Sequence, residues 1–305
     1  MTKHTFIPMT GGIGNQLFQA AFASYLRDNH GFSAWLLNPG MDETPGPTTR
    51  ACQINEILPD EFIIGGSIAK ILHQMSLSRK WQMVSAKIGF LRSVRLEKSP
   101  EKTLGFLPIF PGTHQNRNIL DYALPDIKAR AGAALANRAA EIDLFLLERG
   151  EPPLAESIVI HVRRGDYLVT EWTQTLGKAY YSEAIRTLSV ATSKTTKPIM
   201  VVSDDEASAL ILIQEIIPAA RLLSLSDPVD VIAAIAAAGQ KIIANSTLSL
   251  WGALFGSVCS KIAYPSTWFK GSGDWGPSLC QNRGWHGVPI TQQPPVYVSG
   301  LNYTD

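Results

Sequence analysis

Short apolar runs and amphipathic runs alternate through the second half of the chain. The apolar runs predict strands, and segments with apolar residues at helical spacing between them predict helices of about ten residues. Short apolar strands joined by helices favour a parallel sheet with helices on both faces, which is the α/β class. The predicted strands are 157–162, 198–202, 221–225, 241–244 and 261–264, and the predicted helices are 181–190, 206–216, 229–238 and 248–255.

The first half opens with the same pattern. A strand is predicted at 5–9, and Asn15 follows it as the expected N-cap of a helix. Three longer segments complete this half: a loop of turn residues at 39–47, a basic stretch of helical character at 68–95, and an Ala-rich helix at 127–149.

A glycine and two prolines separate the halves. Gly150 is followed by Pro152 and Pro153, a combination that ends a helix. The sequence therefore predicts two domains, 1–150 and 151–305.

Composition narrows the class of protein. Of 305 residues, 45% are hydrophobic and 17% charged, so the chain can bury a substantial core. Lys and Arg number 27 against 26 Asp and Glu, so no nucleic-acid partner is expected and recognition of an anion must be local. The three cysteines match no zinc or disulfide framework and are expected to be reduced thiols. No signal peptide or membrane-length apolar segment is evident, so we expect a soluble, cytoplasmic protein.

A glycine-rich loop follows the first predicted strand. The sequence Gly11-Gly12-Ile13-Gly14 stands between that strand and a helix, where backbone N–H groups and a helix N-terminus can bind an anion. The loop lacks the third glycine of a dinucleotide-binding fingerprint and the Gly-Lys-Ser/Thr of a P-loop. Phosphate or sugar binding and an ordinary tight turn are both compatible with it.

Two adjacent arginines follow the first strand of the second half. The segment is His161-Val162-Arg163-Arg164-Gly165-Asp166-Tyr167. Ligands of open parallel sheets lie beyond the carboxyl ends of strands, and one arginine there can form a fork to a diphosphate. The other can be held by a carboxylate, for which Asp166 is a candidate. A surface cluster of ion pairs is the alternative.

Polar residues also follow two later strands. Ser203 and Asp204 come after one strand and are candidates either for a helix cap or for ligand binding. Asp204 and the next aspartate are adjacent, so they lack the Asp-x-Asp spacing of many metal-binding glycosyltransferases. Asn245, Ser246 and Thr247 come after another strand and open a helix, as a second anion site or as a simple cap.

Asp230 lies at the start of the helix predicted at 229–238. A carboxylate there is favourable at a helix N-terminus for electrostatic reasons alone. If it points into a cleft, it can also accept the N1–H and N2–H of guanine, an edge that adenine lacks.

Together these segments resemble the bacterial α-1,2-fucosyltransferase family. The motifs occur in the family's order between residues 11 and 269. They differ from the family pattern at Leu250, where a tryptophan is usual, and in the segment near Gly105 that belongs to the acceptor side. The matching stretches are GGIGNQLFQ from Gly11, HVRRGDY from His161, SDD from Ser203, IIANSTLSLWGA from Ile242 and PSTWF from Pro265.

The resemblance implies a GT-B fold, with two Rossmann-like domains whose parallel sheets face a cleft, the first on the acceptor side and the second binding the donor. It implies GDP-fucose as donor, inversion at the anomeric carbon, and neither cofactor nor required metal. Arg163 would bind the β-phosphate, and His161 and Asp230 the guanine. The other implied donor-binding residues are Gly12, Gly14, Asn15, Ser203, Asp204, Asn245, Ser246 and Thr247.

The implied reaction moves L-fucose to a hydroxyl group, galactose O-2 of an oligosaccharide or lipid-linked glycan. Arg163 and two helix N-termini would neutralise the leaving diphosphate. The base that takes the acceptor proton is Asp166 or Glu171, with Glu171 slightly favoured because a more distant fucosyltransferase class has its base there.

Other readings remain open. The chain could use another GDP-sugar, act as a nicotinamide-dependent oxidoreductase with a degenerate dinucleotide loop, or bind sugars without catalysis. The basic stretch at 68–95 is compatible with a peripheral contact at the inner face of a membrane and also with a solvated helix pair. The acceptor, the linkage and the oligomeric state are not determined by the sequence.

Overall fold

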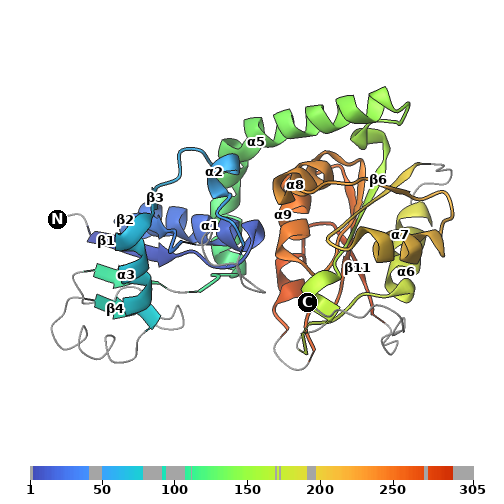
Figure 1. Cartoon of the computed structure of the whole chain (residues 1–305). Coiled ribbons are helices and arrows are strands. Elements are labelled where there is room, and N and C mark those ends of the chain that lie inside the picture. The colour runs from blue at the N-terminus through green and yellow to red at the C-terminus, as the bar shows by residue number, and fades with distance from the viewer. Residues whose placement is uncertain are drawn as a thin grey trace, which may run out of the picture. The chain divides into compact units, whose positions relative to one another are not determined.

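The computed structural model describes residues 3–40, 50–77, 91–93, 107–110, 112–168, 170–171, 173–190, 197–270 and 274–290. The chain divides into two units, Met1–Arg138 and Ala139–Asp305, each with its own parallel sheet (Figure 1). Most of the predicted loop at 39–47 and much of the basic stretch at 68–95 lie outside the described residues.

The N-terminal unit contains a five-stranded parallel sheet in the order β3-β2-β1-β5-β4. Its central strand is β1, where Phe6 is in register with Trp35 on one side and Ile109 on the other. The strand predicted at 5–9 is therefore confirmed within a residue or two of its ends. The five strands are β1 (Lys3–Pro8), β2 (Phe32–Leu37), β3 (Ile63–Ile64), β4 (Leu91–Ser93) and β5 (Leu107–Ile109).

Helix α1 (Ile13–His30) starts directly after the glycine loop and buries an apolar face that includes Leu17 and Phe22. Its N-cap is Gly12, which has extended backbone angles. The prediction that Asn15 caps this helix was wrong, because the chain already turns helical at Ile13 and Asn15 lies inside the first turn.

The basic stretch is not one continuous helix. Helix α3 covers Gly66–Leu77, but Leu91–Ser93 forms β4 and pairs in parallel with β5, with Arg92 opposite Pro108. The helical prediction was wrong for those three residues because hydrogen bonding to a neighbouring strand overrides local spacing. A short helix, α2 (Ile54–Ile57), precedes this stretch.

The Ala-rich helix begins earlier than predicted. Helix α5 spans Arg117–Glu148 rather than 127–149. Its start follows Asn116, whose Oδ1 accepts the N–H of Asn118 at 2.9 Å and of Ile119 at 3.3 Å. This side-chain cap satisfies backbone donors that a helix start leaves unpaired.

Helix α5 also passes through the division between the units, which falls between Arg138 and Ala139. The sequence placed the domain boundary at Gly150, where the helix has ended and the glycine adopts a φ of 68°. Gly150 thus ends the helix as predicted, and the units separate upstream of it.

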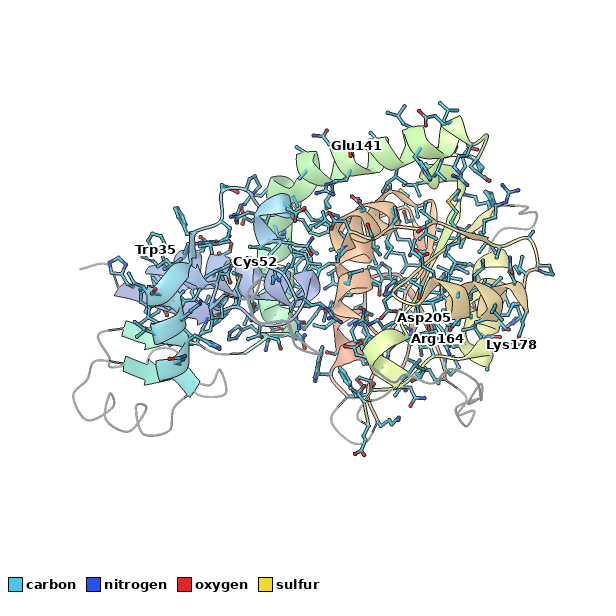
Figure 2. All side chains as sticks on the ribbon, in the orientation of Figure 1. Trp35, Cys52, Glu141, Arg164, Lys178 and Asp205 are labelled. Carbon is cyan, nitrogen blue, oxygen red and sulfur yellow. The ribbon has the colours of Figure 1, made fainter. Side chains whose placement is uncertain are left out.

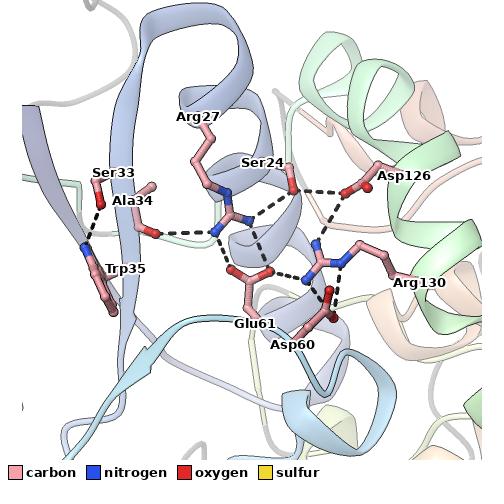
Figure 3. Close-up of polar contacts among 9 residues, drawn as sticks. All are labelled: Ser24, Arg27, Ser33, Ala34, Trp35, Asp60, Glu61, Asp126 and Arg130. Carbon is pink, nitrogen blue, oxygen red and sulfur yellow. Dashed lines mark hydrogen bonds and ion pairs between the residues drawn. The ribbon is translucent and has the colours of Figure 1, made fainter. Parts of the chain in front are cut away.

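A shared carboxylate ties three segments of the N-terminal unit together (Figure 3). The fully buried side chain of Glu61 pairs with Arg27 of α1 at 2.8 Å and with Arg130 of α5 at 2.9 Å. Arg130 also reaches Asp60 and Asp126, each at 3.3 Å. The network fixes α1, the segment before β3 and the first half of α5 to one another.

The C-terminal unit contains six strands in the order β11-β10-β9-β6-β7-β8, all paired in parallel. Every residue of β6 is buried, as expected for a central strand covered on both faces. All five predicted strands are present. They are β6 (Ile158–Val162), β7 (Ile199–Ser203), β8 (Arg221–Leu222), β9 (Gln240–Ile242) and β10 (Lys261–Pro265).

One strand of this sheet was missed. β11 covers His286–Val288 and pairs with β10, with Ala263 opposite His286. It has three residues and no apolar run, so only its position beside β10 makes it a strand.

Four predicted helices cover the C-terminal sheet. Figure 1 shows α8 and α9 on one face and α6 and α7 on the other. Between the elements lie three short 3-10 turns, η2 (Leu154–Glu156), η3 (Gly165–Leu168) and η4 (Gly276–Leu279). The helices are α6 (Lys178–Val190), α7 (Glu206–Gln214), α8 (Pro228–Ala237) and α9 (Thr247–Phe255).

Cys52, Cys259 and Cys280, all among the described residues, form no disulfide bond. Within the described part of the chain, no helix has the length and apolar character needed to cross a membrane.

Candidate functional site

Three neighbouring strands of the C-terminal unit end at the same edge of the sheet. β6 lies between β7 and β9, and the sequence motifs follow these three strands directly. The motif that starts at His161 continues from β6 into η3, Asp204 follows β7, and Asn245 follows β9. Side-chain contacts between these segments show that they meet, as the next paragraphs describe.

Arg163 is the centre of this cluster. Its Nη2 donates to Asp166 Oδ1 at 2.7 Å, and its Nη1 is 3.1 Å from Asp204 Oδ2. Its guanidinium carbon lies 5.3 Å from the ring centre of Tyr167, within the range of a cation–π contact. Two carboxylates and an aromatic ring therefore fix the orientation of this guanidinium.

The pairing of Asp166 differs from the prediction. Asp166 was expected to hold Arg164, but it binds Arg163, because η3 curls the chain so that residues three apart come together. Arg164 lies beside Asp205 instead, with Nε and Oδ2 3.8 Å apart, and Figure 2 shows these two side chains in the C-terminal unit.

Asp204 connects the ends of β6 and β7. Its Oδ1 accepts the backbone N–H of Arg164 at 2.9 Å, while Oδ2 faces Arg163. A Cβ atom at Gly165 would collide with this carboxylate, so a side chain there would have to displace Asp204. The alternative that Asp204 caps α7 was wrong, since the N-cap is Asp205, which accepts the N–H of Ser208 at 3.3 Å.

Ser203 is the last residue of β7 and has a local role. Its hydroxyl accepts the backbone N–H of Asp205 at 3.0 Å and lies 3.2 Å from that residue's carbonyl oxygen. The structure thus shows it shaping the turn into α7.

The guanidinium of Arg163 retains hydrogen-bonding capacity. Each terminal nitrogen carries two N–H groups, so one on each remains for a ligand even when both nitrogens bind a carboxylate. The side chain is 19% exposed. However, the cluster contains three aspartates and two arginines, so an entering anion needs further positive potential from backbone N–H groups.

Helix α9 can supply that potential. Its N-cap is Ser246, whose side chain makes no capping hydrogen bond, and Thr247 is its first residue. The backbone N–H groups of a first helical turn have no partner within the helix. This nine-residue helix starts at the carboxyl end of β9, directly beside the Arg163 segment.

Asn245 mainly holds the site together. Its Nδ2 donates to the carbonyl oxygens of Gln174 at 2.7 Å and Trp268 at 2.8 Å, and its own carbonyl accepts the Tyr167 hydroxyl at 2.9 Å. Burial raises the pKa of Tyr167 to about 12, so the hydroxyl stays a donor. The side-chain donors of Asn245 are thus already used, and only its buried Oδ1 lacks a partner.

His161 is buried within β6 and only 3% exposed. Burial, together with the nearby charge of Arg163, lowers the pKa of its imidazole to about 3. The ring is therefore neutral at physiological pH. Its Nδ1 is buried without a hydrogen-bond partner.

Asp230 and Glu171 are the two other predicted residues of the C-terminal unit. Asp230 is half-buried in the first turn of α8. The N-cap of this helix is Asp227, whose carboxylate accepts the N–H of Val229 at 2.9 Å. Glu171 is exposed on the loop after η3. The structure describes no ion pair of Glu171 with another described residue.

The glycine loop of the N-terminal unit is built for close packing. Gly11 has a φ of 72°, and a Cβ there would collide with the Asn15 side chain. A Cβ at Gly12 would lie 3.5 Å from Cγ of Arg50. Arg50 thus lies against the loop, and no motif in the sequence indicated it.

Buried amides connect this loop to its neighbours. Gln16 donates to the carbonyl of Ala51 at 2.7 Å and accepts the N–H of Gln53 at 3.0 Å. Gly14 is buried at the start of α1, where it contributes to packing. The predicted donor residues of this loop and those following β6, β7 and β9 belong to different units.

Within the described residues, no group of three His, Cys, Asp or Glu side chains is arranged to hold a metal ion. Among the described residues, Arg163, Arg164 and the N-terminus of α9 supply positive potential at the site.

Comparisons with known proteins give matches only at the level of structure. No protein-family model and no curated protein matches the sequence. The fucosyltransferase NodZ from Bradyrhizobium is similar in structure, with a TM-score of 0.51, 13% identity, and coverage of 84% of this chain and 94% of NodZ. Another similar structure is that of NodZ α-1,6-fucosyltransferase soaked with GDP-fucose.

Two other solved structures are similar at the same level. A variant of Arabidopsis thaliana FUT1 in complex with GDP has a TM-score of 0.50, 9% identity, and coverage of 87% of this chain and 70% of that one. A glycosyl transferase of family 9 from Veillonella parvula has a TM-score of 0.50, 8% identity, and coverage of 94% and 86%. Since these likenesses rest on structure, they establish the fold: the chain has the GT-B fold of two α/β units with parallel sheets.

Proposed function

We propose that the protein is a glycosyltransferase that uses a GDP-sugar, and specifically that it moves L-fucose from GDP-β-L-fucose to a glycan with inversion. The acceptor group in this proposal is galactose O-2 of an oligosaccharide or lipid-linked glycan, as in the α-1,2-fucosyltransferases that the sequence motifs resemble. The reaction takes place in the cytoplasm and requires no metal.

The observation that supports the proposal is the arrangement around Arg163. A guanidinium is held by two carboxylates at the end of a central strand, next to the start of α9. This combination suits a diphosphate, because a planar fork and backbone N–H groups both bind phosphate oxygens. The GT-B fold and the GDP bound to one structural neighbour agree with this reading.

The chemistry requires stabilisation of the leaving group and a base. As the sugar–phosphate bond breaks, negative charge grows on the β-phosphate, and Arg163 with the first turn of α9 would stabilise it. Glu171 would take the proton of the attacking hydroxyl, because Asp166 is already paired with Arg163. His161 and Asp230 would bind the guanine, as the resemblance of the sequence motifs implies.

A thermal-shift panel tests the donor. We expect GDP to raise the melting temperature more than UDP, ADP or NAD, since a ligand at a hundred times its Kd adds about 2.7 kcal/mol. Arg163→Ala should abolish the GDP shift and lower turnover of GDP-fucose by about 100- to 1000-fold. Arg186→Ala is a matched control, because Arg186 also pairs with an acid three residues away, on an exposed surface.

The outcomes discriminate between the readings. Equal shifts with all nucleotides, or a shift with NAD alone, would contradict a GDP-sugar transferase. Consumption of GDP-mannose but not GDP-fucose would favour another GDP-sugar. Linkage analysis of the product by NMR should show an α-1,2 bond to galactose, whereas an α-1,6 bond would place the enzyme nearer to NodZ in activity.

A further inference from the structure

His114 has an unusual backbone for a histidine. Its φ is 53°, and among the described non-glycine residues only His114 and Asn282 have a positive φ. This region is sterically unfavourable for residues with a side chain, and strained residues cluster at functional sites. The conformation therefore calls for an explanation in what the side chain does.

The surroundings fix the ring of His114. It stacks on Phe22 of α1, with ring centres 4.0 Å apart and planes 22° from parallel, and it is 8% exposed. Its Nε2 lies 3.0 Å from the carbonyl oxygen of Phe110. Because a carbonyl can only accept, Nε2 must carry the proton, so Nδ1 carries a lone pair.

That lone pair is available to a ligand. Nδ1 has no hydrogen-bond partner among the described residues. His114 keeps 8% of its surface exposed, so the ring is not closed off from solvent. Burial lowers the pKa of the His114 imidazole to about 4, which keeps the ring neutral and makes Nδ1 a hydrogen-bond acceptor rather than a base at neutral pH.

The position of His114 connects it to the glycine loop. It follows β5, next to β1, so both segments lie at the carboxyl edge of the N-terminal sheet. Gln115 Nε2 donates to Asn15 Oδ1 at 2.8 Å, and the buried Gln19 Nε2 donates to the carbonyl of Gly112 at 2.8 Å. The segment that carries His114 is thus attached to Asn15 through Gln115, at the edge where open α/β sheets bind ligands.

We propose that Nδ1 of His114 accepts a hydrogen bond from a hydroxyl group of the glycan acceptor and contributes to acceptor specificity. The inference rests on the proposed transferase function. A sugar hydroxyl is the complementary group, because it donates one hydrogen bond and carries no charge that a neutral, mostly buried ring would have to balance. His114 binds the acceptor and transfers no proton.

The test compares acceptor kinetics in two variants. The wild-type protein is first assayed with labelled GDP-fucose on an array of galactose-terminated glycans that includes lactose, and the best acceptor is used thereafter. His114→Phe keeps a ring on Phe22 and removes both nitrogens, so we expect the acceptor KM to rise about tenfold, with the donor KM unchanged. His114→Gln offers one donor and one acceptor and should recover most of the loss.

Two controls separate binding from folding. Melting temperatures of both variants report any loss of stability, and Asn282→Ala changes the other residue of positive φ, in the other unit. Donor and acceptor KM rising together in His114→Phe, or an unchanged acceptor KM, would overturn the inference, as would GDP binding without transfer to any glycan of the array. Absence of GDP binding in the wild-type protein would instead contradict the proposed function.

Discussion

Two carboxylates follow the arginine pair, and within the described part of the chain only Asp166 is paired with a guanidinium. Asp166 binds Arg163 at 2.7 Å, whereas Glu171 is exposed on the next loop. Replacing a carboxylate that orients a phosphate-binding arginine should change GDP affinity. Replacing a carboxylate that accepts the proton should change the turnover rate. This difference allows the base to be identified by measurement.

We predict that Glu171→Gln lowers kcat by about 100- to 10,000-fold, because the attacking hydroxyl loses its base, while GDP affinity stays the same. Asp166→Asn should weaken GDP binding, since Arg163 loses one of the two carboxylates that orient it. Calorimetry with GDP and steady-state kinetics with GDP-fucose measure the two effects. If Asp166→Asn alone abolished turnover with unchanged GDP affinity, Asp166 would be the base.

The sequence indicated most of the residues in this cluster but not their contacts. An arginine pair at the end of an apolar strand is visible in the pattern, and so are the aspartates after the next strand. Which carboxylate binds which arginine depends on the curl of η3, which leaves no periodic signal. Arg50 and His114 were missed for a similar reason, because each is placed by the folding of a loop onto a distant segment.

At the scale of elements, the ends of β6 and β7 are joined through Gly165 and Asp204. The Asp204 carboxylate occupies the space that a side chain at Gly165 would need, and it accepts the N–H of Arg164 at 2.9 Å. The distance between the ends of β6 and β7 therefore depends on the absence of a side chain at Gly165 and on the carboxylate of Asp204.

We predict that Gly165→Ala weakens GDP binding by at least about tenfold, because the new methyl group displaces Asp204 from Arg163 and one charge-assisted contact is lost. Titration of GDP followed by calorimetry measures the change. Gly132→Ala is the control, since Gly132 is exposed in α5 and has open space at its Cβ; it should raise stability by about 0.5–1 kcal/mol. Unchanged GDP affinity in Gly165→Ala would show that GDP binding does not depend on the contact between Asp204 and Arg163.

Long periodic elements were predictable, and short or context-dependent ones were not. The strands and helices of the C-terminal unit follow from hydrophobic spacing, with ends that differ by a few residues. β4 and β11, three residues each, exist only through pairing with a neighbour. The start of α5 was missed because Asn116, not an apolar repeat, begins the helix.

At the scale of the whole molecule, the sequence indicated two α/β halves, and the structure has two units with parallel sheets. The units separate at Arg138, inside a continuous helix, whereas a sequence boundary is sought where a helix is broken. The sequence of α5 shows no glycine or proline break at the division between the units, because the helix continues through it with its hydrogen bonds uninterrupted.

Stability of the whole protein should depend on pH through two buried histidines. Burial lowers the pKa of His161 to about 3 and that of His114 to about 4, from an ordinary value of 6.5. Well above pH 6.5 both rings are neutral in the folded and in the unfolded chain. Below it the unfolded chain binds protons that the folded chain excludes, so the free energy of unfolding falls as pH falls.

We therefore predict a lower free energy of unfolding at about pH 5 than at about pH 7.5, measured by urea denaturation. His114→Gln should reduce the size of this difference, because one of the buried histidines that bind a proton on unfolding is removed. An identical free energy of unfolding at both pH values would contradict the burial of neutral rings.

The shared carboxylate of Glu61 constrains how the N-terminal unit can change over evolutionary time. Loss of Arg27 or of Arg130 alone leaves Glu61 with one partner, and loss of Glu61 leaves two cations facing each other. Removing one member of a buried ionic set is costly, whereas exchanging the whole set for apolar side chains is often tolerated. A substitution at one of these three positions is therefore tolerated best when the other two change with it. We expect the three residues to be replaced together in related sequences rather than one at a time.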